Sequence, residues 1–207
     1  MDLSYGKEYD EFRANVREFL AANWPPKEAD RAEGARGFRQ KGIEAGYLYR
    51  SIPRKYGGSE QESDAVEAQI LREEFSHVHA PMETRGIGMM MLVPPLLERA
   101  EEWQKEKFVP ATVAGDYKWC QGYSEPGSGS DLASLRTRGE RVGDEWVING
   151  QKIWTSGAKT ADYMFCLTRT EPEQPKHAGI SYLLIDMKQP GIDVRPLRQM
   201  TGGADFC

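Results

Sequence analysis

The sequence predicts an α+β fold, in which an all-helical domain at residues 1–116 precedes a β domain at residues 117–207 that forms an antiparallel barrel or sandwich. Two observations predict it. As far as Gly115, apolar residues recur at steps of three and four, the period of an amphipathic helix. After Gly115, short runs rich in β-branched and aromatic residues alternate with turn residues, as strands do. Helices first and strands afterwards is the order of an α+β protein or of two subdomains.

The helical half divides at its turn residues. The first helix is predicted from an apolar face made of Tyr5, Tyr9, Phe12, Val16, Phe19 and Leu20. Trp24-Pro25-Pro26 ends it, and a second helix is predicted at about residues 36–45. Asp64 and Glu67 resemble a capping box in front of a third helix.

Two more helices are predicted before the period changes. The apolar stretch 87–97 predicts a buried helix that is broken or kinked at its proline pair, Pro94 and Pro95. A more charged helix that contains Trp103 and Phe108 follows and ends by Gly115.

The β half begins with a predicted strand at residues 117–123. Further β-rich runs are 135–142, 146–149, 163–170, 180–187 and 192–197, and Gly143-Asp144-Glu145 joins the first two as a hairpin. The last residues turn into a new strand at Phe206, where the chain stops. Because a domain rarely ends at such a point, we expect this chain to be a fragment.

Composition limits the classes of partner. The 207 residues carry 27 Lys and Arg against 32 Asp and Glu, so the net charge of −5 argues against general nucleic-acid binding. The first eleven residues are mostly charged and polar, unlike a leader peptide. The longest uncharged stretch, residues 86–97, is too short to span a bilayer. We expect a cytoplasmic protein with no membrane span.

The stretch Gln121–Asp131 is the first candidate for a binding site. Its glycines lack a Cβ, so the backbone can approach a ligand, and its serines and N–H groups can form an anion-binding concavity. The loop alone favours a tight turn, because Leu132 occupies the place of the third Rossmann glycine and the P-loop Gly-Lys-Ser/Thr is absent. Trp154, beside two hydroxyls, is either a platform for a planar ring or a core tryptophan at a strand end.

Two other chemistries find little support in the sequence. His77-x-His79 has no further Cys, Asp or His at ligand spacing, so no metal site is predicted. Gly127-Ser128-Gly129 is one residue too tight for the Gly-x-Ser-x-Gly elbow of a serine hydrolase.

Two stretches taken together resemble the acyl-CoA dehydrogenase family of flavoproteins. They are Ser124-Glu-Pro-Gly-Ser-Gly-Ser-Asp131 and Gly143-Asp-Glu-Trp-Val-Ile-Asn-Gly-Gln-Lys-Ile-Trp154, in the family's order and spacing. Ile52-Pro53 and Tyr56-Gly57-Gly58 extend the resemblance into the helical half. It implies a helical N-terminal domain, a middle β domain against which FAD lies, and a C-terminal four-helix domain. It also implies subunits that form homodimers or homotetramers, or that associate with a related subunit.

The resemblance places eight residues at the flavin: Gln121, Tyr123, Ser124, Gly129, Ser130, Trp154, Thr155 and Ser156. The Tyr123 backbone and the Ser124 hydroxyl would bond the pyrimidine edge of the ring. Gly129 and Ser130 would lie near the pyrophosphate, and Ser130 would also touch the acyl-CoA substrate.

The second stretch would serve the ring itself. Trp154 would pack on the isoalloxazine, and Ser156 would donate towards its reactive nitrogen. Ser124 and Ser156 stand where many family members have Thr, so the hydroxyl is kept without the methyl group that restricts its rotamer.

The implied reaction is the α,β-dehydrogenation of an acyl-CoA thioester to a trans-2-enoyl-CoA, as in the β-oxidation of fatty acids. Electrons would then pass to an electron-acceptor flavoprotein. The family's catalytic base is a glutamate of the C-terminal domain, and no glutamate here, Glu125 included, matches it. The base is therefore expected beyond Cys207, and this fragment is expected to be inactive. The alternatives are a non-catalytic scaffold or partner subunit of the same fold, and a related flavin oxidase or monooxygenase.

Overall fold

The computed structural model describes residues 6–25 and 31–207, and of residues 31–33 the backbone alone. Tyr5 and Pro26, which the sequence assigned to the first helix and its end, lie outside these residues.

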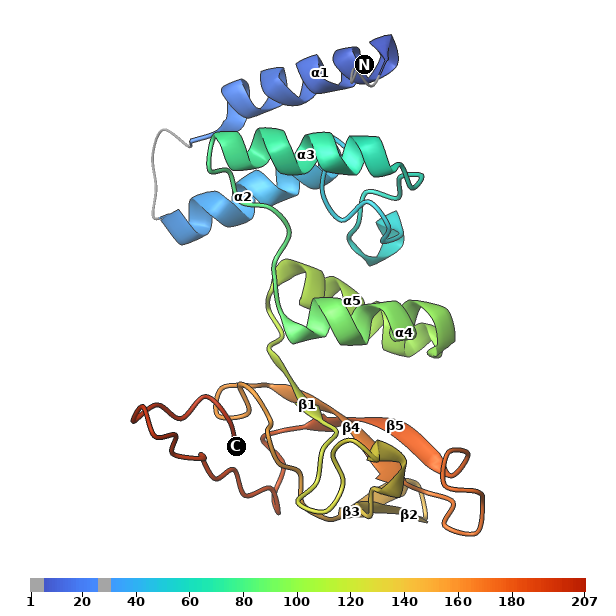
Figure 1. Ribbon diagram of the computed structural model, residues 1–207. Helices are drawn as coiled ribbons and strands as arrows, with labels where there is room; N and C mark the ends of the chain where they lie inside the picture. Colours follow the sequence, from blue (N-terminus) through green and yellow to red (C-terminus); the bar gives the residue numbers. More distant parts are fainter. Residues whose placement is uncertain (1–5, 26–30) are drawn as a thin grey trace. The chain divides into compact units, whose positions relative to one another are not determined.

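The described chain forms two compact units. The first is helical and combines the residues up to Arg85 with Arg99–Gly115. The second combines Gly86–Glu98 with Asp116–Cys207 and contains the β-sheet (Figure 1). The helical segment before Glu98 therefore belongs with the sheet, although helices surround it in the sequence.

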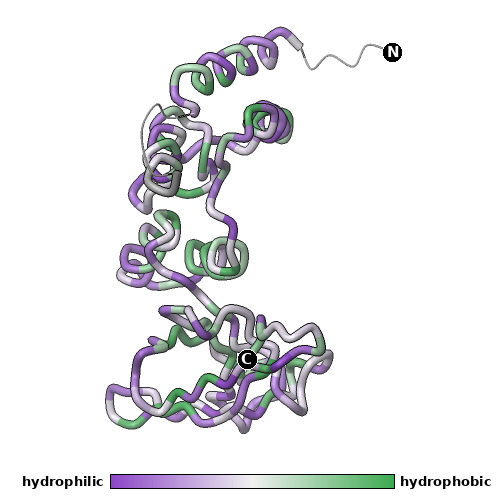
Figure 2. Tube along the Cα trace, turned by 90° about the vertical axis from the view of Figure 1, so that its left-hand side faces the viewer, coloured by the Kyte–Doolittle hydropathy of each residue, from purple (hydrophilic) through white to green (hydrophobic). Residues whose placement is uncertain are grey.

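The helical unit contains α1 (Lys7–Asn23), α2 (Arg31–Glu44), α3 (Ala65–His77) and α5 (Glu102–Ala114), with a 3₁₀ turn at Arg54–Tyr56. Helix α1 packs against α3, and its alternating hydropathy is visible beside the N-terminus in Figure 2. Val16 and Leu20 are buried on its inner face, where each side chain contributes about 1.5–3 kcal/mol. On its outer edge Arg13 and Arg17 both bind Glu74, at 2.6 and 2.8 Å.

Asp64 begins helix α3 as predicted. Its Oδ1 accepts the N–H groups of Val66 and Glu67 at 2.8 and 3.0 Å, and the Glu67 bond is the main cause of its lowered pKa. The Glu67 side chain binds Arg50. Tyr9 donates to the second oxygen of Asp64 at 3.0 Å, which joins α1 to the start of α3.

A partly buried loop precedes α3 and depends on two glycines. Gly57 has a φ of +90°, in the left-handed region that favours glycine. A Cβ on Gly58 would stand 2.1 Å from the carbonyl oxygen of Ile52, so any larger residue collides with the backbone. The Tyr49 hydroxyl ties the same loop to Thr84 N, at 2.8 Å, and to Val113 O, at 3.1 Å.

The sheet contains β1 (Trp119–Gly122), β2 (Arg138–Val142), β3 (Glu145–Asn149), β4 (Tyr163–Arg169) and β5 (Ile180–Asp186). Strand β5 runs antiparallel along the whole of β4. Strands β1 and β2 pair parallel with successive parts of β4, and β3 pairs antiparallel with β2 as the predicted hairpin.

The expectation of an antiparallel sheet is therefore wrong in this respect, because the sheet is mixed. Parallel pairing of β1 with β4 requires a long connection. The segment between these strands, which carries the hairpin and both candidate loops, provides it. The run at 192–197 forms no regular strand, and Leu197 makes one bridge to Phe206.

The apolar helix of the sheet unit departs from α geometry just before its prolines. Gly88–Leu92 is a π-helical turn, and α4 (Val93–Arg99) continues from it with Pro94 and Pro95 in its first turn. Pro95 has no N–H to give to the carbonyl of Met91, four residues earlier. That carbonyl accepts the Tyr182 hydroxyl of β5 at 3.3 Å, which fixes the helix to the sheet.

We predict that Gly58→Ala destabilises the helical unit by about 1–3 kcal/mol or more, because the Cβ cannot avoid the Ile52 carbonyl. Gly37→Ala in helix α2 is the matched control. Outside the helix's own backbone, no heavy atom of the described residues lies within 4 Å of its Cβ position, so the substitution should stabilise by up to about 1 kcal/mol through helix propensity. Urea unfolding followed by far-ultraviolet circular dichroism compares the two variants, and equal midpoints would contradict the packing argument.

Candidate functional site

Two loops that the sequence separates by about twenty residues lie side by side in the sheet unit. One follows β1 and contains Tyr123 and Ser124, and the other follows β3 and contains Lys152 and Ile153. Ile153 N–H donates to the Ser124 carbonyl at 2.9 Å, and the Lys152 ammonium donates to the Tyr123 carbonyl at 3.1 Å. The two predicted halves of the site are thus joined by their backbones.

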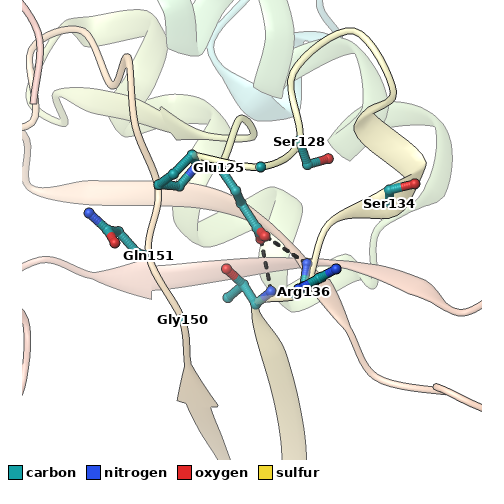
Figure 3. A pocket seen from close by; sticks show the side chains of 9 residues that line it. Glu125, Ser128, Ser134, Arg136, Gly150 and Gln151 are labelled. Atoms are coloured by element: carbon teal, nitrogen blue, oxygen red, sulfur yellow. Dashed lines mark hydrogen bonds between the residues drawn. The ribbon is translucent and has the colours of Figure 1, made fainter.

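Glu125 and Lys152 form a buried ion pair beneath this junction. Their side chains are each 8% exposed, and Lys152 Nζ lies 2.9 Å from Glu125 Oε1. The carboxylate also accepts the N–H groups of Arg136, at 2.7 Å, and Thr137, at 2.8 Å (Figure 3). Burial opposes the charge on Glu125, but these bonds from Thr137, Arg136 and Lys152 outweigh it and lower the pKa to about 2.

The glycine-serine loop is fixed at both ends and open in the middle. Glu125 and Ser128 exchange backbone hydrogen bonds at 2.8 and 3.0 Å, and Ser128 Oγ donates to the Asp131 carbonyl at 2.7 Å. Between these anchors Gly129 and Ser130 are exposed, and no heavy atom of the described residues lies within 4 Å of a Cβ position on Gly129. The backbone there is accessible to a ligand.

Trp154 has an unusual conformation for a bulky residue. Its φ is +62°, and its side chain is 60% exposed, with the ring edge-on to Phe206 at 5.9 Å between centroids. A non-glycine residue in this region is uncommon, and such outliers gather at functional sites. The indole is therefore a displayed surface, and the alternative of a core tryptophan is not what the fold adopts.

Thr155 and Ser156 differ in their surroundings. Thr155 exchanges backbone hydrogen bonds with Cys207 at 3.0 and 3.1 Å and is 3% exposed. Its Oγ1 is buried and has no hydrogen-bond partner among the residues that the structure describes. Ser156 is exposed and forms a bridge with Phe206, so its hydroxyl lies at the surface beside Trp154.

Gln121 and Tyr123 direct their side chains into the sheet unit. Gln121 Nε2 lies 3.3 Å from the sulfur of Met91. The Tyr123 ring contacts those of Phe165 and Tyr182, at 5.8 and 6.5 Å, and burial raises its pKa. Tyr123 thus contributes its backbone, and not its phenol, to the junction of the loops.

A cavity of about 300 Å³ is lined by the Glu125–Ser128 turn and by Arg136, Gly150 and Gln151 (Figure 3). None of the eight predicted site residues lines it.

Among residues 6–25 and 31–207, no group of three or more His, Cys, Asp or Glu could hold a metal ion. No helix in the described ranges is long and apolar enough to cross a membrane.

The donor set fits a planar cofactor that ends in phosphates. An exposed indole, the exposed hydroxyl of Ser156 and the orphaned hydroxyl of Thr155 share one segment. The open backbone at Gly129 lies in the other segment. Lys152 is not among the residues predicted from the sequence, and Glu125 was considered there only as a base. The available signal was a pair of opposite charges, each within two residues of a candidate residue in an otherwise uncharged stretch.

Comparison with known proteins covers both halves of the chain. Residues 6–116 match the model of the acyl-CoA dehydrogenase N-terminal domain, and residues 120–206 match that of the middle domain. Acyl-CoA dehydrogenase IpdE1 of Mycobacterium tuberculosis is 39% identical over 97% of this chain and 54% of its own length.

Two solved structures show the same fold. The ChsE4–ChsE5 complex from Mycobacterium tuberculosis matches with a TM-score of 0.68 and 33% identity, over 100% of this chain and 53% of that one. The Tcur3481–Tcur3483 steroid ACAD matches with a TM-score of 0.68 and 35% identity, over 100% of this chain and 54% of that one. This chain spans about half the length of these relatives.

Glu125 should make the stability of the sheet unit depend on acid pH. Its pKa is lowered from 4.5 to about 2. The stability that the ionised carboxylate contributes to the fold is therefore complete above pH 4.5 and is lost as the pH falls towards 2. We predict that Glu125→Gln lowers the free energy of unfolding by about 3–5 kcal/mol near neutrality, because Lys152 loses its charged buried partner. The difference in unfolding free energy between the variant and the wild type should become smaller below pH 4.5. Urea midpoints at pH 6, 4 and 3 measure it, with the exposed Glu145→Gln as control. A gap that stays constant with pH would contradict the prediction.

Proposed function

Because this chain belongs to the acyl-CoA dehydrogenase family, we propose that it forms the helical and β parts of an FAD-dependent enzyme that dehydrogenates an acyl-CoA thioester between Cα and Cβ. The observation that carries the proposal is the junction of the two loops. Ile153 N–H on the Ser124 carbonyl brings the displayed Trp154 next to the glycine-serine loop. A planar ring and a phosphate chain need these two surfaces together.

FAD would be held by the eight residues named from the sequence, with the Tyr123 backbone and Ser124 at the pyrimidine edge and Gly129 with Ser130 at the pyrophosphate. When bound, FAD accepts the hydride from Cβ of the substrate. Hydrogen-bond donors of the chain at the pyrimidine edge stabilise the negative charge that reduction places there. Trp154 orients the ring from its face.

Removal of the proton from Cα needs a base, and Glu125 cannot act as that base. Its carboxylate is buried and already accepts bonds from Lys152, Arg136 N and Thr137 N. A carboxylate with a pKa of about 2 is also a poor proton acceptor near neutral pH. We assign this step to a glutamate outside these 207 residues.

We further propose a polycyclic substrate class and a heteromeric assembly. The support is the nature of two solved relatives. One is the Tcur3481–Tcur3483 steroid ACAD, and the other is a complex of ChsE4 with ChsE5. The homodimer or homotetramer expected from the sequence is the competing arrangement. An electron-acceptor flavoprotein would reoxidise the enzyme.

The complete gene product that contains this chain tests the function. It should purify with a flavin band at about 450 nm. The band should bleach under anaerobic conditions with the CoA thioester of a steroid side chain faster than with a straight-chain acyl-CoA. Absence of flavin would refute the proposal. Bleaching that reverses in air with formation of peroxide would indicate the flavin oxidase alternative. Bound flavin that no thioester bleaches would indicate the non-catalytic subunit.

Gly129→Ala separates binding from folding. Its Cβ meets no atom of the described chain, so we predict an unchanged melting temperature but at least tenfold weaker FAD binding, because the methyl group enters the space proposed for the pyrophosphate. Gly127→Ala, equally open and two residues earlier, is the matched control and should bind FAD like the wild type. Flavin titration of the apoprotein gives both affinities, and equal values for the two variants would remove Gly129 from the site.

A further inference from the structure

We propose that Lys152, held in place by Glu125, is a positioning residue for the flavin loop, which fixes the Tyr123–Ser124 peptide and strengthens its N–H as a donor. The proposal rests on the function above and deepens it, because it names the buried group that would tune the cofactor through the chain.

The clamp has two parts in consecutive residues. Lys152 Nζ donates to the Tyr123 carbonyl at 3.1 Å, and Ile153 N–H donates to the Ser124 carbonyl at 2.9 Å. Residues 152 and 153 therefore occupy the carbonyls of residues 123 and 124 in register. Because both carbonyls are hydrogen-bonded, the orientation of the peptide that joins Tyr123 to Ser124 is restrained.

Glu125, the residue after Ser124, orients the ammonium and is itself held by a third segment, residues 136–137. Its carboxylate receives the Arg136 and Thr137 N–H groups at 2.7 and 2.8 Å, so it cannot follow Lys152 if the lysine moves. The two side chains, each 8% exposed, form a buried dipole whose positive end lies on the Tyr123 carbonyl. Burial keeps this dipole from being screened by water or salt.

A charged donor on a peptide carbonyl acts on the far side of the same peptide. Charge-assisted hydrogen bonds are roughly twice as strong as neutral ones, and hydrogen-bonded groups in series polarise one another. The carbonyl of Tyr123 and the N–H of Ser124 belong to one peptide unit. The ammonium therefore makes the Ser124 N–H a stronger donor at the edge where a reduced flavin carries negative charge.

A purely structural ion pair would stabilise the fold without changing the electronic state of the flavin. The midpoint potential of the bound flavin therefore distinguishes the two roles, because it reports the relative stability of oxidised and reduced forms and not the stability of the protein. The thermal midpoint reports the structural contribution separately.

The experiment compares Lys152→Gln, Lys152→Met and Lys152→Arg in the complete flavin-loaded protein. Gln can still donate to the Tyr123 carbonyl but carries no charge, so it keeps a testable protein if Met fails to fold. We expect Gln and Met to shift the flavin potential to more negative values and to slow anaerobic flavin reduction at least tenfold. Arg, which restores a cation, should recover most of both effects.

Lys176→Met is the matched control. Lys176 binds Asp131 of the same loop at 2.9 Å, but both side chains are more than half exposed, so its loss should leave the potential unchanged. Variants of Lys152 that melt earlier yet keep the wild-type potential would overturn the proposal and leave a structural pair. A wild-type protein without flavin would refute the proposed function instead, so the two failures are distinct.

Discussion

The buried contact between Glu125 and Lys152 is the constraint on which the site depends. A charge inside a protein is tolerated only when it is paired and hydrogen-bonded. This pair meets that condition, because Glu125 accepts the Arg136 and Thr137 N–H groups and Lys152 donates to the Tyr123 carbonyl. The cost of separating the charges means that the loop after β1 cannot leave the segment after β3 without exposing both. This contact therefore helps to hold the exposed indole of Trp154 near the open backbone of Gly129.

Much of the fold could be predicted because its signals are local. The helical period of α1, the Asp64 cap of α3 and the Gly143–Glu145 hairpin each depend on residues close in sequence. The eight predicted site residues stay a prediction as flavin contacts, but the structure brings most of them to two joined loops. Resemblance supplied their roles, whereas Gly127-x-Gly129 and the tryptophan, taken separately, allowed ordinary turns and cores.

What could not be predicted depends on pairing between distant residues. Strand β1 pairs parallel with β4 across a long connection. An apolar run in the sequence does not indicate whether its strand pairs parallel or antiparallel with a distant one. The hydrogen bond from the Tyr182 hydroxyl to the Met91 carbonyl joins residues that lie 91 positions apart, so the sequence around Pro94 gives no sign of it. Glu125 could be recognised as a buried ion only when the backbone of residues 136–137 and Lys152 were placed around it.

The helical segment Gly86–Glu98 has a consequence for how this chain is made. It belongs to the sheet unit, yet it is synthesised before α5 and before every strand that it contacts. Its partner Tyr182 leaves the ribosome more than eighty residues later. During synthesis this apolar helix, in which Met90 is 76% exposed even in the folded structure, therefore has no sheet to pack against. The helical unit, too, is completed only when Arg99–Gly115 has emerged. Neither unit can therefore fold as one uninterrupted stretch of nascent chain, because part of the other unit is synthesised between its two stretches.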